Sequence, residues 1–150
     1  MPLIWRSMKA EKDMPQIGRG GALLGVRVGP EQRDDINPDE NGIVYLGKGG
    51  MSVAPSVDAL PPHRLPRRLR DSMPDRFPAA CGSNALCCWS MGKGEFKEEL
   101  VTERLNLRLD PDRPNKHGFV EPHDKMAIED YEASLSATRE SWQLWTEVKQ

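Results

Sequence analysis

Long apolar runs and a strong excess of one charge are both missing from this 150-residue sequence. The longest apolar stretches, 22–26 and 85–89, are far shorter than the roughly 20 residues that a membrane-spanning helix needs. The 21 Lys and Arg residues nearly balance the 23 Asp and Glu residues, which gives a formal net charge of −2. We therefore expect neither a membrane protein nor a chain that coats a polyanion along its whole surface.

Cysteine is scarce, and the cysteines form no metal-binding pattern. Cys81, Cys87 and Cys88 include no pair with the C-x-x-C spacing of zinc sites. Neighbouring strand residues point to opposite faces, so Cys87 and Cys88 are poorly placed to bridge each other. We expect three reduced thiols, at least one of them in the core. The N-terminus lacks a hydrophobic signal region with a cleavage site, so we expect a cytoplasmic protein, or one exported without a cleavable signal peptide.

Glycine and proline are abundant by contrast, with 13 residues of each. This turn-rich composition argues against a helical bundle and favours short strands joined by loops. Prolines recur throughout residues 55–80, and proline cannot donate a hydrogen bond to a strand ladder. We therefore expect an extended loop over residues 55–80.

Apolar runs and alternating patterns predict strands at 3–8, 42–46, 51–54, 84–90, 98–109 and 117–122. The C-terminal segment differs, because its large apolar residues recur at the spacing of a helix face. They are Ile128, Tyr131, Leu135, Trp142 and Trp145. This stripe predicts a long helix over residues 125–147, with Asp124 as its N-cap. The order of elements predicts one α+β domain over residues 1–150, with small twisted antiparallel or mixed sheets and a long C-terminal helix.

Two glycine-rich segments are only superficially like phosphate-binding loops. Residues 18–21 contain three glycines, but Gly25 interrupts any helix that would follow them. Residues 47–50 lack the Gly-Lys-Ser/Thr ending of a P-loop. We interpret both segments as turns.

The only basic cluster lies at residues 63–70, which hold four arginines. Acidic residues flank it, and no aromatic residue for base stacking lies between Tyr45 and Phe77. We interpret the cluster as a solvated loop, with a phosphate-contacting loop as the alternative. We do not expect nucleic acid as a partner, and we keep its binding through residues 64–70 only as the weakest of the functional hypotheses.

Histidine suggests a metal site at first sight, but the spacing argues against it. His117 and His123 would lie about 20 Å apart on a straight strand, at about 3.3 Å per residue. They could not then hold one ion, so we expect no metal cofactor. Three single residues on separate predicted strands remain as functional candidates: Arg6, Ser52 and Glu121. Each has an ordinary structural explanation when taken alone.

A resemblance to a known protein family links these three residues to one function. Residues 42–53 contain a glycine pair ahead of a Ser-Val strand, and in residues 116–126 a histidine opens a short strand that a proline closes. Both segments, together with the opening strand that carries Arg6, resemble the type VI secretion exported toxins of ADP-ribosyltransferase-like fold. The resemblance covers roughly residues 3–8, 42–55 and 115–142.

The resemblance implies an ADP-ribosyltransferase-like toxin that binds NAD and transfers ADP-ribose or consumes NAD. Glu121 would stabilise the oxocarbenium-like ribose, and Ser52 would orient the reacting groups as a catalytic and binding residue. Arg6 would bind phosphate or ribose oxygens, and His117 would bind a ribose hydroxyl. A toxin also implies an immunity or neutralising protein as a partner.

In an alternative interpretation, the chain has the same fold but no catalytic activity. The chain would then be a catalytically inactive interaction module, in which Arg6, Ser52 and Glu121 lie apart. The polar loops at 29–41 and 56–78 would bind a protein partner.

Overall fold

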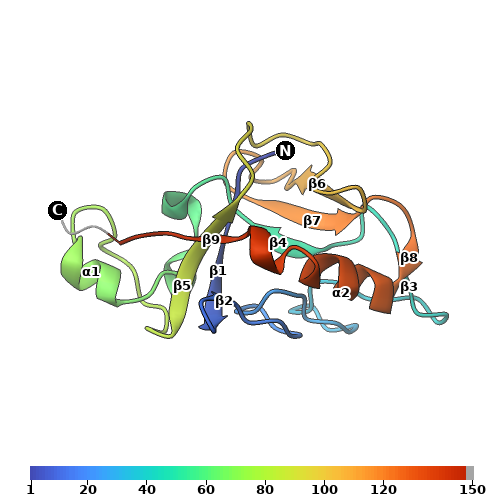
Figure 1. Ribbon diagram of the computed structural model, residues 1–150, viewed down its shortest axis with the longest axis horizontal. Helices are drawn as coiled ribbons and strands as arrows, with labels where there is room; N and C mark the ends of the chain where they lie inside the picture. The colour runs from blue at the N-terminus through green and yellow to red at the C-terminus, as the bar shows by residue number, and fades with distance from the viewer. Residues whose placement is uncertain (148–150) are drawn as a thin grey trace.

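The computed structural model describes residues 1–147 and folds them into three small antiparallel sheets and one principal helix (Figure 1). One sheet has four strands in the order β2-β1-β5-β9, another has three in the order β4-β7-β6, and β3 pairs with β8. The strands are β1 (Ile4–Glu11), β2 (Met14–Pro15), β3 (Ile43–Val44), β4 (Met51–Val53), β5 (Leu86–Met91), β6 (Leu105–Leu109), β7 (Gly118–Pro122), β8 (Met126–Ala127) and β9 (Gln143–Leu144). The chain is an α+β protein, which confirms the predicted class.

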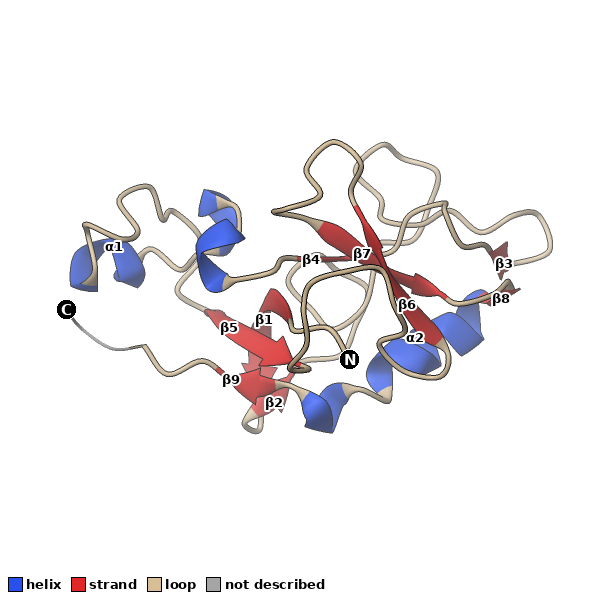
Figure 2. Ribbon diagram, turned by 90° about the horizontal axis from the view of Figure 1, so that it is seen from above, coloured by secondary structure: helices blue, strands red, loops and turns tan. Residues whose placement is uncertain are grey.

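The helices are mostly short, and α1 and α2 lie on opposite sides of the strand β1 (Figure 2). The helices are η1 (Val57–Ala59), η2 (Pro62–Arg64), α1 (Arg68–Ser72), α2 (Ile128–Ser136) and η3 (Arg139–Ser141). Of the helices in the part of the chain that the structure describes, only α2 exceeds two turns. None of the helices within residues 1–147 has the length and apolar character needed to cross a membrane.

The two larger sheets meet where β1 passes β4. The Trp5 N–H donates to the Ala54 carbonyl at 2.8 Å, and the Ala54 N–H donates back to the Trp5 carbonyl at 2.9 Å. This pair of hydrogen bonds fixes the next residue of β1, Arg6, beside β4 and its central residue, Ser52. Two of the predicted site residues are therefore neighbours because the sheets join at this point.

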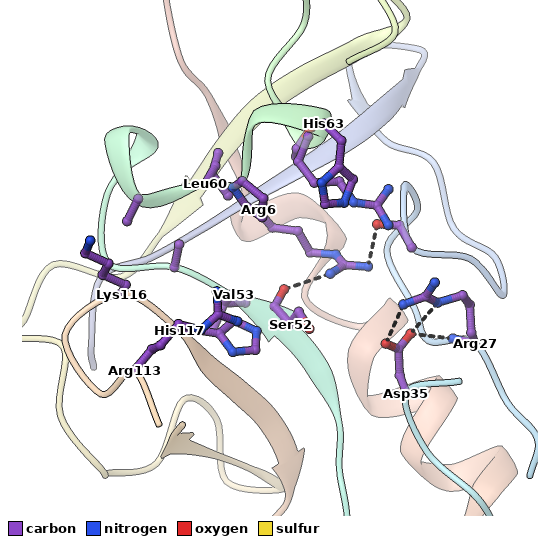
Figure 3. A pocket seen from close by; sticks show the side chains of 16 residues that line it. Arg6, Arg27, Asp35, Ser52, Val53, Leu60, His63, Arg113, Lys116 and His117 are labelled. Carbon is purple, nitrogen blue, oxygen red and sulfur yellow. Dashed lines mark hydrogen bonds and ion pairs between the residues drawn. The ribbon is translucent and has the colours of Figure 1, made fainter. Parts of the chain in front are cut away.

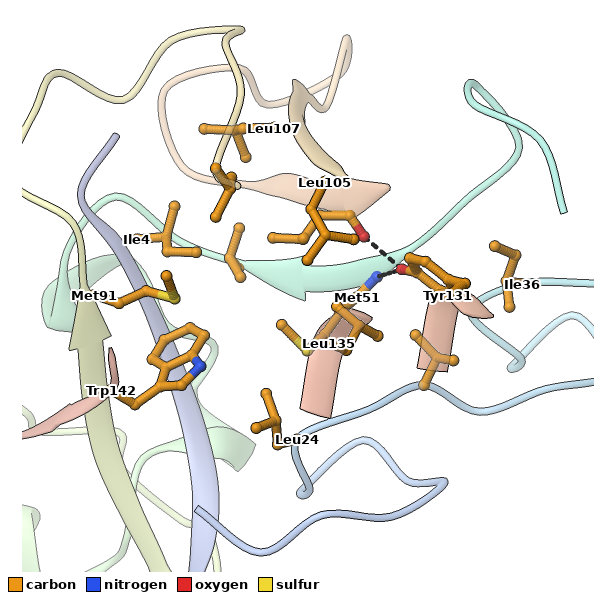
Figure 4. Packing of buried hydrophobic residues seen from close by; sticks show 14 of the residues in the cluster. Ile4, Leu24, Ile36, Met51, Met91, Leu105, Leu107, Tyr131, Leu135 and Trp142 are labelled. Atoms are coloured by element: carbon orange, nitrogen blue, oxygen red, sulfur yellow. Dashed lines mark hydrogen bonds between the residues drawn. The ribbon is translucent and has the colours of Figure 1, made fainter. Parts of the chain in front are cut away.

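The principal core is built from residues of both larger sheets and of helix α2 (Figure 4). From β1 it receives Ile4 and Met8, which share one face because they are four residues apart on a strand. Tyr131 ties α2 to the three-stranded sheet, since its hydroxyl donates to the Val120 carbonyl and accepts from the Met51 N–H at 3.1 Å. Burial raises the pKa of the Tyr131 hydroxyl, so this group stays protonated and can keep donating.

The C-terminal helix is much shorter than the sequence predicts, so the prediction of a helix over residues 125–147 is wrong. Helix α2 begins after Ala127, not after Asp124, and it ends at Ser136. The Thr138 hydroxyl then bonds to the Leu135 carbonyl at 2.7 Å and receives a hydrogen bond from Trp142 Nε1 at 2.9 Å. This turn places Trp142 in the principal core. Trp142 follows Leu135 at a spacing typical of a helix face, although it lies beyond the end of α2.

Beyond this turn the chain runs extended, because β9 adds to the edge of β5. Trp145 therefore joins a second apolar cluster rather than the face of α2. Its ring contacts those of Trp5 and Phe77 edge to face, with centroids 6.5 and 6.0 Å apart. Five residues of the predicted helix stripe thus divide between two cores, and only the first three belong to the helix.

The proline-rich segment 55–80 is not the extended loop that the sequence predicts. It contains η1, η2 and α1, and its apolar side chains form the second cluster with Cys88. Proline fits here because Pro62 stands at the first position of η2, where a helical turn needs no N–H donor. Two predicted strands are also shorter in the structure, since 42–46 contributes only β3 and 98–109 only β6.

Candidate functional site

A pocket of about 240 Å³ opens where the two larger sheets join (Figure 3). Strand β1 contributes Arg6 and Ser7, β4 contributes Ser52, η2 contributes Arg64, and the turn before β7 contributes His117. The structure thus brings together three residues that the sequence analysis assigned to NAD binding, namely Arg6, Ser52 and His117. They come from segments that are far apart in the sequence.

The Arg6 guanidinium is buried and bonds to main-chain carbonyls. Nη1 donates to Ser52 at 2.7 Å, while Nη2 donates to Leu23 at 2.9 Å and to Gly25 at 3.2 Å. Burial lowers the pKa of Arg6 to about 10, which leaves the side chain charged at neutral pH. Arg6 therefore fastens the turn at 20–25 to β4, and its predicted contact with phosphate or ribose oxygens stays a prediction.

Ser52 occupies the centre of β4, half-buried, and pairs with Phe119 of β7. Paired residues of an antiparallel sheet point to the same face, so Ser52 and Phe119 share a face. Glu121 lies two residues further along β7 and therefore points to that face as well. Ser52 and Glu121 are thus diagonal neighbours, about 7–8 Å apart. The chain reaches β4 through Gly50, where only glycine fits: φ is +153°, and a Cβ would lie 2.6 Å from the Val120 carbonyl oxygen.

Glu121 does not belong to the pocket wall formed by residues 1–147. Its side chain is 2% exposed, and Oε2 accepts hydrogen bonds from the Gly47 N–H at 2.8 Å and from Arg108 Nε at 3.1 Å. The turn that contains Gly47 therefore lies over the carboxylate. In this arrangement Glu121 neutralises Arg108 and anchors the turn to β7, and its catalytic role stays a prediction.

His117 stands at the pocket wall and is paired with a carboxylate. Its Nδ1 lies 2.8 Å from Oδ2 of Asp110, and its ring packs edge to face on Phe119 with centroids 4.7 Å apart. The hydrogen bond from His117 is the main reason why the pKa of Asp110 falls below its ordinary value. The sequence analysis missed Asp110, because a separation of seven residues across a proline-containing turn carries no recognisable signal.

The lining of the pocket is strongly cationic. Within the described residues, its charged side chains are those of Arg6, Arg27, Arg64, Arg113, Lys116 and a single carboxylate, Asp35. Asp35 bonds to Arg27 through both carboxylate oxygens, with the Nη2–Oδ1 pair at 3.2 Å, and so compensates one of these cations. The remaining charges leave a surplus of positive potential inside the pocket.

Arg64 is a pocket cation that is partly buried and has no ion pair within the described chain. It is half-buried, and among residues 1–147 it has no carboxylate within ion-pair distance and no side-chain hydrogen bond. Burial, followed by the nearby Arg27 charge, lowers the pKa of its guanidinium. Arg64 belongs to the basic cluster that the sequence analysis interpreted as a solvated loop, with phosphate contact as the alternative. Its place in the pocket favours the alternative.

Ser7 is a pocket residue that no sequence signal reveals. Its side chain is 2% exposed, and its Oγ is a buried polar atom without a hydrogen-bond partner in residues 1–147. An unsatisfied buried hydroxyl costs roughly 1–3 kcal/mol, so it is uncommon unless something else supplies a partner. Ser7 belongs to the pocket lining, but its Oγ has almost no accessible surface and lies in the protein interior.

The described chain holds no cluster of histidine, cysteine and acidic side chains suited to a metal ion. His123, the second histidine of the rejected metal hypothesis, places Nδ1 3.1 Å from the Arg104 carbonyl. It does not line the pocket with His117 in the described residues.

Comparisons of the whole sequence with known proteins add no family to this picture. A scan against protein-family models finds no match, and a search of curated proteins finds none either. The geometry and charge of the pocket therefore carry the functional conclusion.

Proposed function

We propose that this chain binds NAD in the pocket between β1 and β4, as an ADP-ribosyltransferase-like toxin domain that transfers ADP-ribose or consumes NAD. One observation chiefly supports the proposal: among residues 1–147, five cationic side chains and one carboxylate line the pocket. Such a lining favours an anionic ligand over a neutral or cationic one. The pyrophosphate of a dinucleotide supplies that negative charge.

Arg64 is the residue we assign to the pyrophosphate. A half-buried guanidinium loses part of its hydration, and in the described chain the Asp35 charge offsets this loss only at longer range, without an ion pair to Arg64. The planar guanidinium fork matches two phosphate oxygens at once, which makes arginine well suited to this contact. The sequence analysis gave this role to Arg6, whose donors are instead engaged by main-chain carbonyls.

The size of the pocket defines how much of NAD it can enclose. Its volume of about 240 Å³ lies below the roughly 300–1,000 Å³ of pockets that bury a drug-sized ligand. We infer that one nucleoside half enters and that the other half extends across the mouth toward Arg113 and Lys116. Leu60 and Pro61 line the pocket and would give the enclosed ring an apolar wall, and we assign the Ser52 hydroxyl to a sugar or carboxamide group of the ligand.

Transfer of ADP-ribose requires a group that stabilises positive charge on the ribose as nicotinamide leaves. The resemblance gives this role to Glu121, which shares a sheet face with Ser52. For Glu121 to reach the ribose, the turn at 45–50 has to release its hydrogen bond from Gly47. We propose that ligand binding displaces this turn, whose Tyr45, Leu46 and Lys48 are exposed.

A second candidate function is a catalytically inactive interaction module of the same fold. The burial of Glu121 and its pairing with Arg108 favour it, since both contacts are structural. In this case the pocket binds an anionic group of a protein partner, and a neutralising protein covers its mouth. The two candidates share the pocket and differ in turnover.

The two candidates are separated by measuring nicotinamide release from NAD by the purified protein. The first predicts turnover, which Glu121→Gln and Ser52→Ala reduce at least tenfold. Glu40→Gln, a substitution of an exposed acid, serves as the matched control. Circular dichroism and thermal melting check that each variant is folded. Binding of NAD without any turnover would favour the interaction module, and the absence of both would contradict the proposed function.

A further inference from the structure

The pairing of His117 with Asp110 holds the imidazole in position and favours one tautomer of the neutral ring. Asp110 holds Nδ1 at 2.8 Å, and the Asp110 N–H also donates to the His117 carbonyl at 3.0 Å. The Phe119 ring supports the imidazole from a second direction. With two side-chain contacts and a main-chain bond, the ring has little freedom to turn.

A carboxylate can only accept a hydrogen bond, so the nitrogen that faces Asp110 carries the proton. The low pKa of Asp110 keeps this carboxylate ionised at neutral pH. In the neutral imidazole the proton on Nδ1 leaves Nε2 with a free lone pair. Among residues 1–147, Nε2 has no hydrogen-bond partner, and the side chain lines the pocket.

We propose that His117 is the general base of this pocket and that Asp110 is its positioning residue. The inference rests on the proposed function, because the reaction is the cleavage of NAD. The oxygen of water or of an acceptor hydroxyl forms a bond to the anomeric carbon of the ribose. The bond from that carbon to nicotinamide breaks, and its electron pair leaves with nicotinamide. The proton of the attacking oxygen passes to Nε2.

The Asp110 carboxylate stabilises the imidazolium that this step creates, and solvent later removes the proton. Arg113 lies 3.8 Å from the same carboxylate oxygen, and Lys116 is the other cation of this turn at the pocket. Both are exposed, so water screens their repulsion of the imidazolium more than it screens the contact with Asp110. This assignment gives the pocket a reacting group that needs no movement of the turn over Glu121.

The test compares Asp110→Asn with Asp112→Asn, a matched control in the same turn whose side chain is exposed. Loss of a general base costs about 10²–10⁴-fold in rate, so Asp110→Asn should lower kcat by about 100-fold or more. Its KM for NAD should stay within about twofold, because only the reacting step is affected. His117→Gln should lower kcat at least as much, and Asp110→Glu should recover part of it.

Nitrogen NMR of the labelled protein at pH 8.5 supplies a readout that does not depend on turnover. The wild-type protein should show His117 with the proton on Nδ1, and Asp110→Asn should lose this preference. Full kcat in folded Asp110→Asn, or a wild-type ring protonated on Nε2, would overturn the inference while leaving the proposed function intact. Absence of turnover in the wild-type protein would instead contradict the transferase proposal and remove the catalytic role of His117 with it.

Discussion

The Arg6 guanidinium donates a hydrogen bond to the main-chain oxygen of Ser52, 2.7 Å away, at the point where the two larger sheets join. The same side chain also holds the carbonyls of Leu23 and Gly25. One buried cation therefore connects β1, β4 and the turn at 20–25. The pocket owes its shape to this connection, whatever molecule it binds.

Replacing Arg6 with lysine should lower the free energy of unfolding. Lysine keeps the charge but lacks the planar fork that reaches several carbonyls, and buried hydrogen bonds to charged groups contribute about 1.5–3 kcal/mol each. We expect a loss of about 2–3 kcal/mol, seen as a lower urea midpoint with an unchanged slope. Arg19→Lys is the matched control, because Arg19 is 57% exposed and its ion pair with Glu132 contributes less than about 1 kcal/mol. Equal stability of the two variants would show that the Arg6 contacts are not structural.

The substitution Ser7→Ala should affect the free energy of unfolding and the affinity for NAD independently. Ser7→Ala removes a buried hydroxyl that has no partner, so the free energy of unfolding should stay the same or rise by up to about 1 kcal/mol. Affinity for NAD should stay within about twofold, since the Ser7 Oγ has almost no surface open to a ligand in the pocket. Calorimetry and thermal melting measure the two effects, with Ser90→Ala on the neighbouring strand as the control. A clear loss of stability in Ser7→Ala would mean that the hydroxyl has a partner within the protein.

Asp110 makes stability depend on pH at the acid end. Its pKa in the folded protein lies below the ordinary 3.8, so the unfolded chain binds the proton more readily. The stabilisation is fully present above about pH 4 and is lost as the pH falls through the folded pKa. Asp110→Asn should therefore be less stable than the wild-type protein at pH 6, and the difference should shrink toward pH 3. Urea unfolding at several pH values tests this, and a constant difference would contradict it.

The cysteines should differ sharply in reactivity. Burial raises the pKa of the Cys88 thiol to about 12, whereas Cys81 is exposed. The thiolate is the reactive form, so iodoacetamide at pH 8 should modify Cys81 in the folded protein and leave Cys88 unmodified. Mass spectrometry of peptides reports both sites, and denaturation in urea should make Cys88 reactive. Rapid labelling of Cys88 without denaturant would mean that the second apolar cluster opens readily.

The strands were predictable where local pattern and burial agree. Residues 3–8 and 84–90 were expected as strands, and they form the central pair β1 and β5. The early end of helix α2 at Ser136 was not predictable, because Trp142 is buried by a turn that returns to the core at helical spacing. Spacing alone does not distinguish these two ways of placing an apolar residue on one side of the core.

The pocket was predictable only in part. The resemblance led to Arg6, Ser52 and His117, which line it together. It could not show that Arg6 bonds to main-chain carbonyls or that the Gly47 turn lies over Glu121, since both depend on contacts between distant segments. The contact of Asp110 with His117 and the missing partner of the Ser7 hydroxyl within the described chain likewise depend on the three-dimensional arrangement and leave no signal in the sequence.

The central claim is that the cationic pocket binds NAD through Arg64, and calorimetric titration of NAD tests it most directly. The wild-type protein should bind with Kd below about 1 mM, and Arg64→Gln should weaken binding about tenfold or more through the loss of a charged hydrogen bond. Arg67→Gln, at an exposed position outside the pocket wall of the described chain, should bind as the wild type does. Absence of NAD binding by the wild-type protein, or equal affinity in Arg64→Gln, would contradict the account.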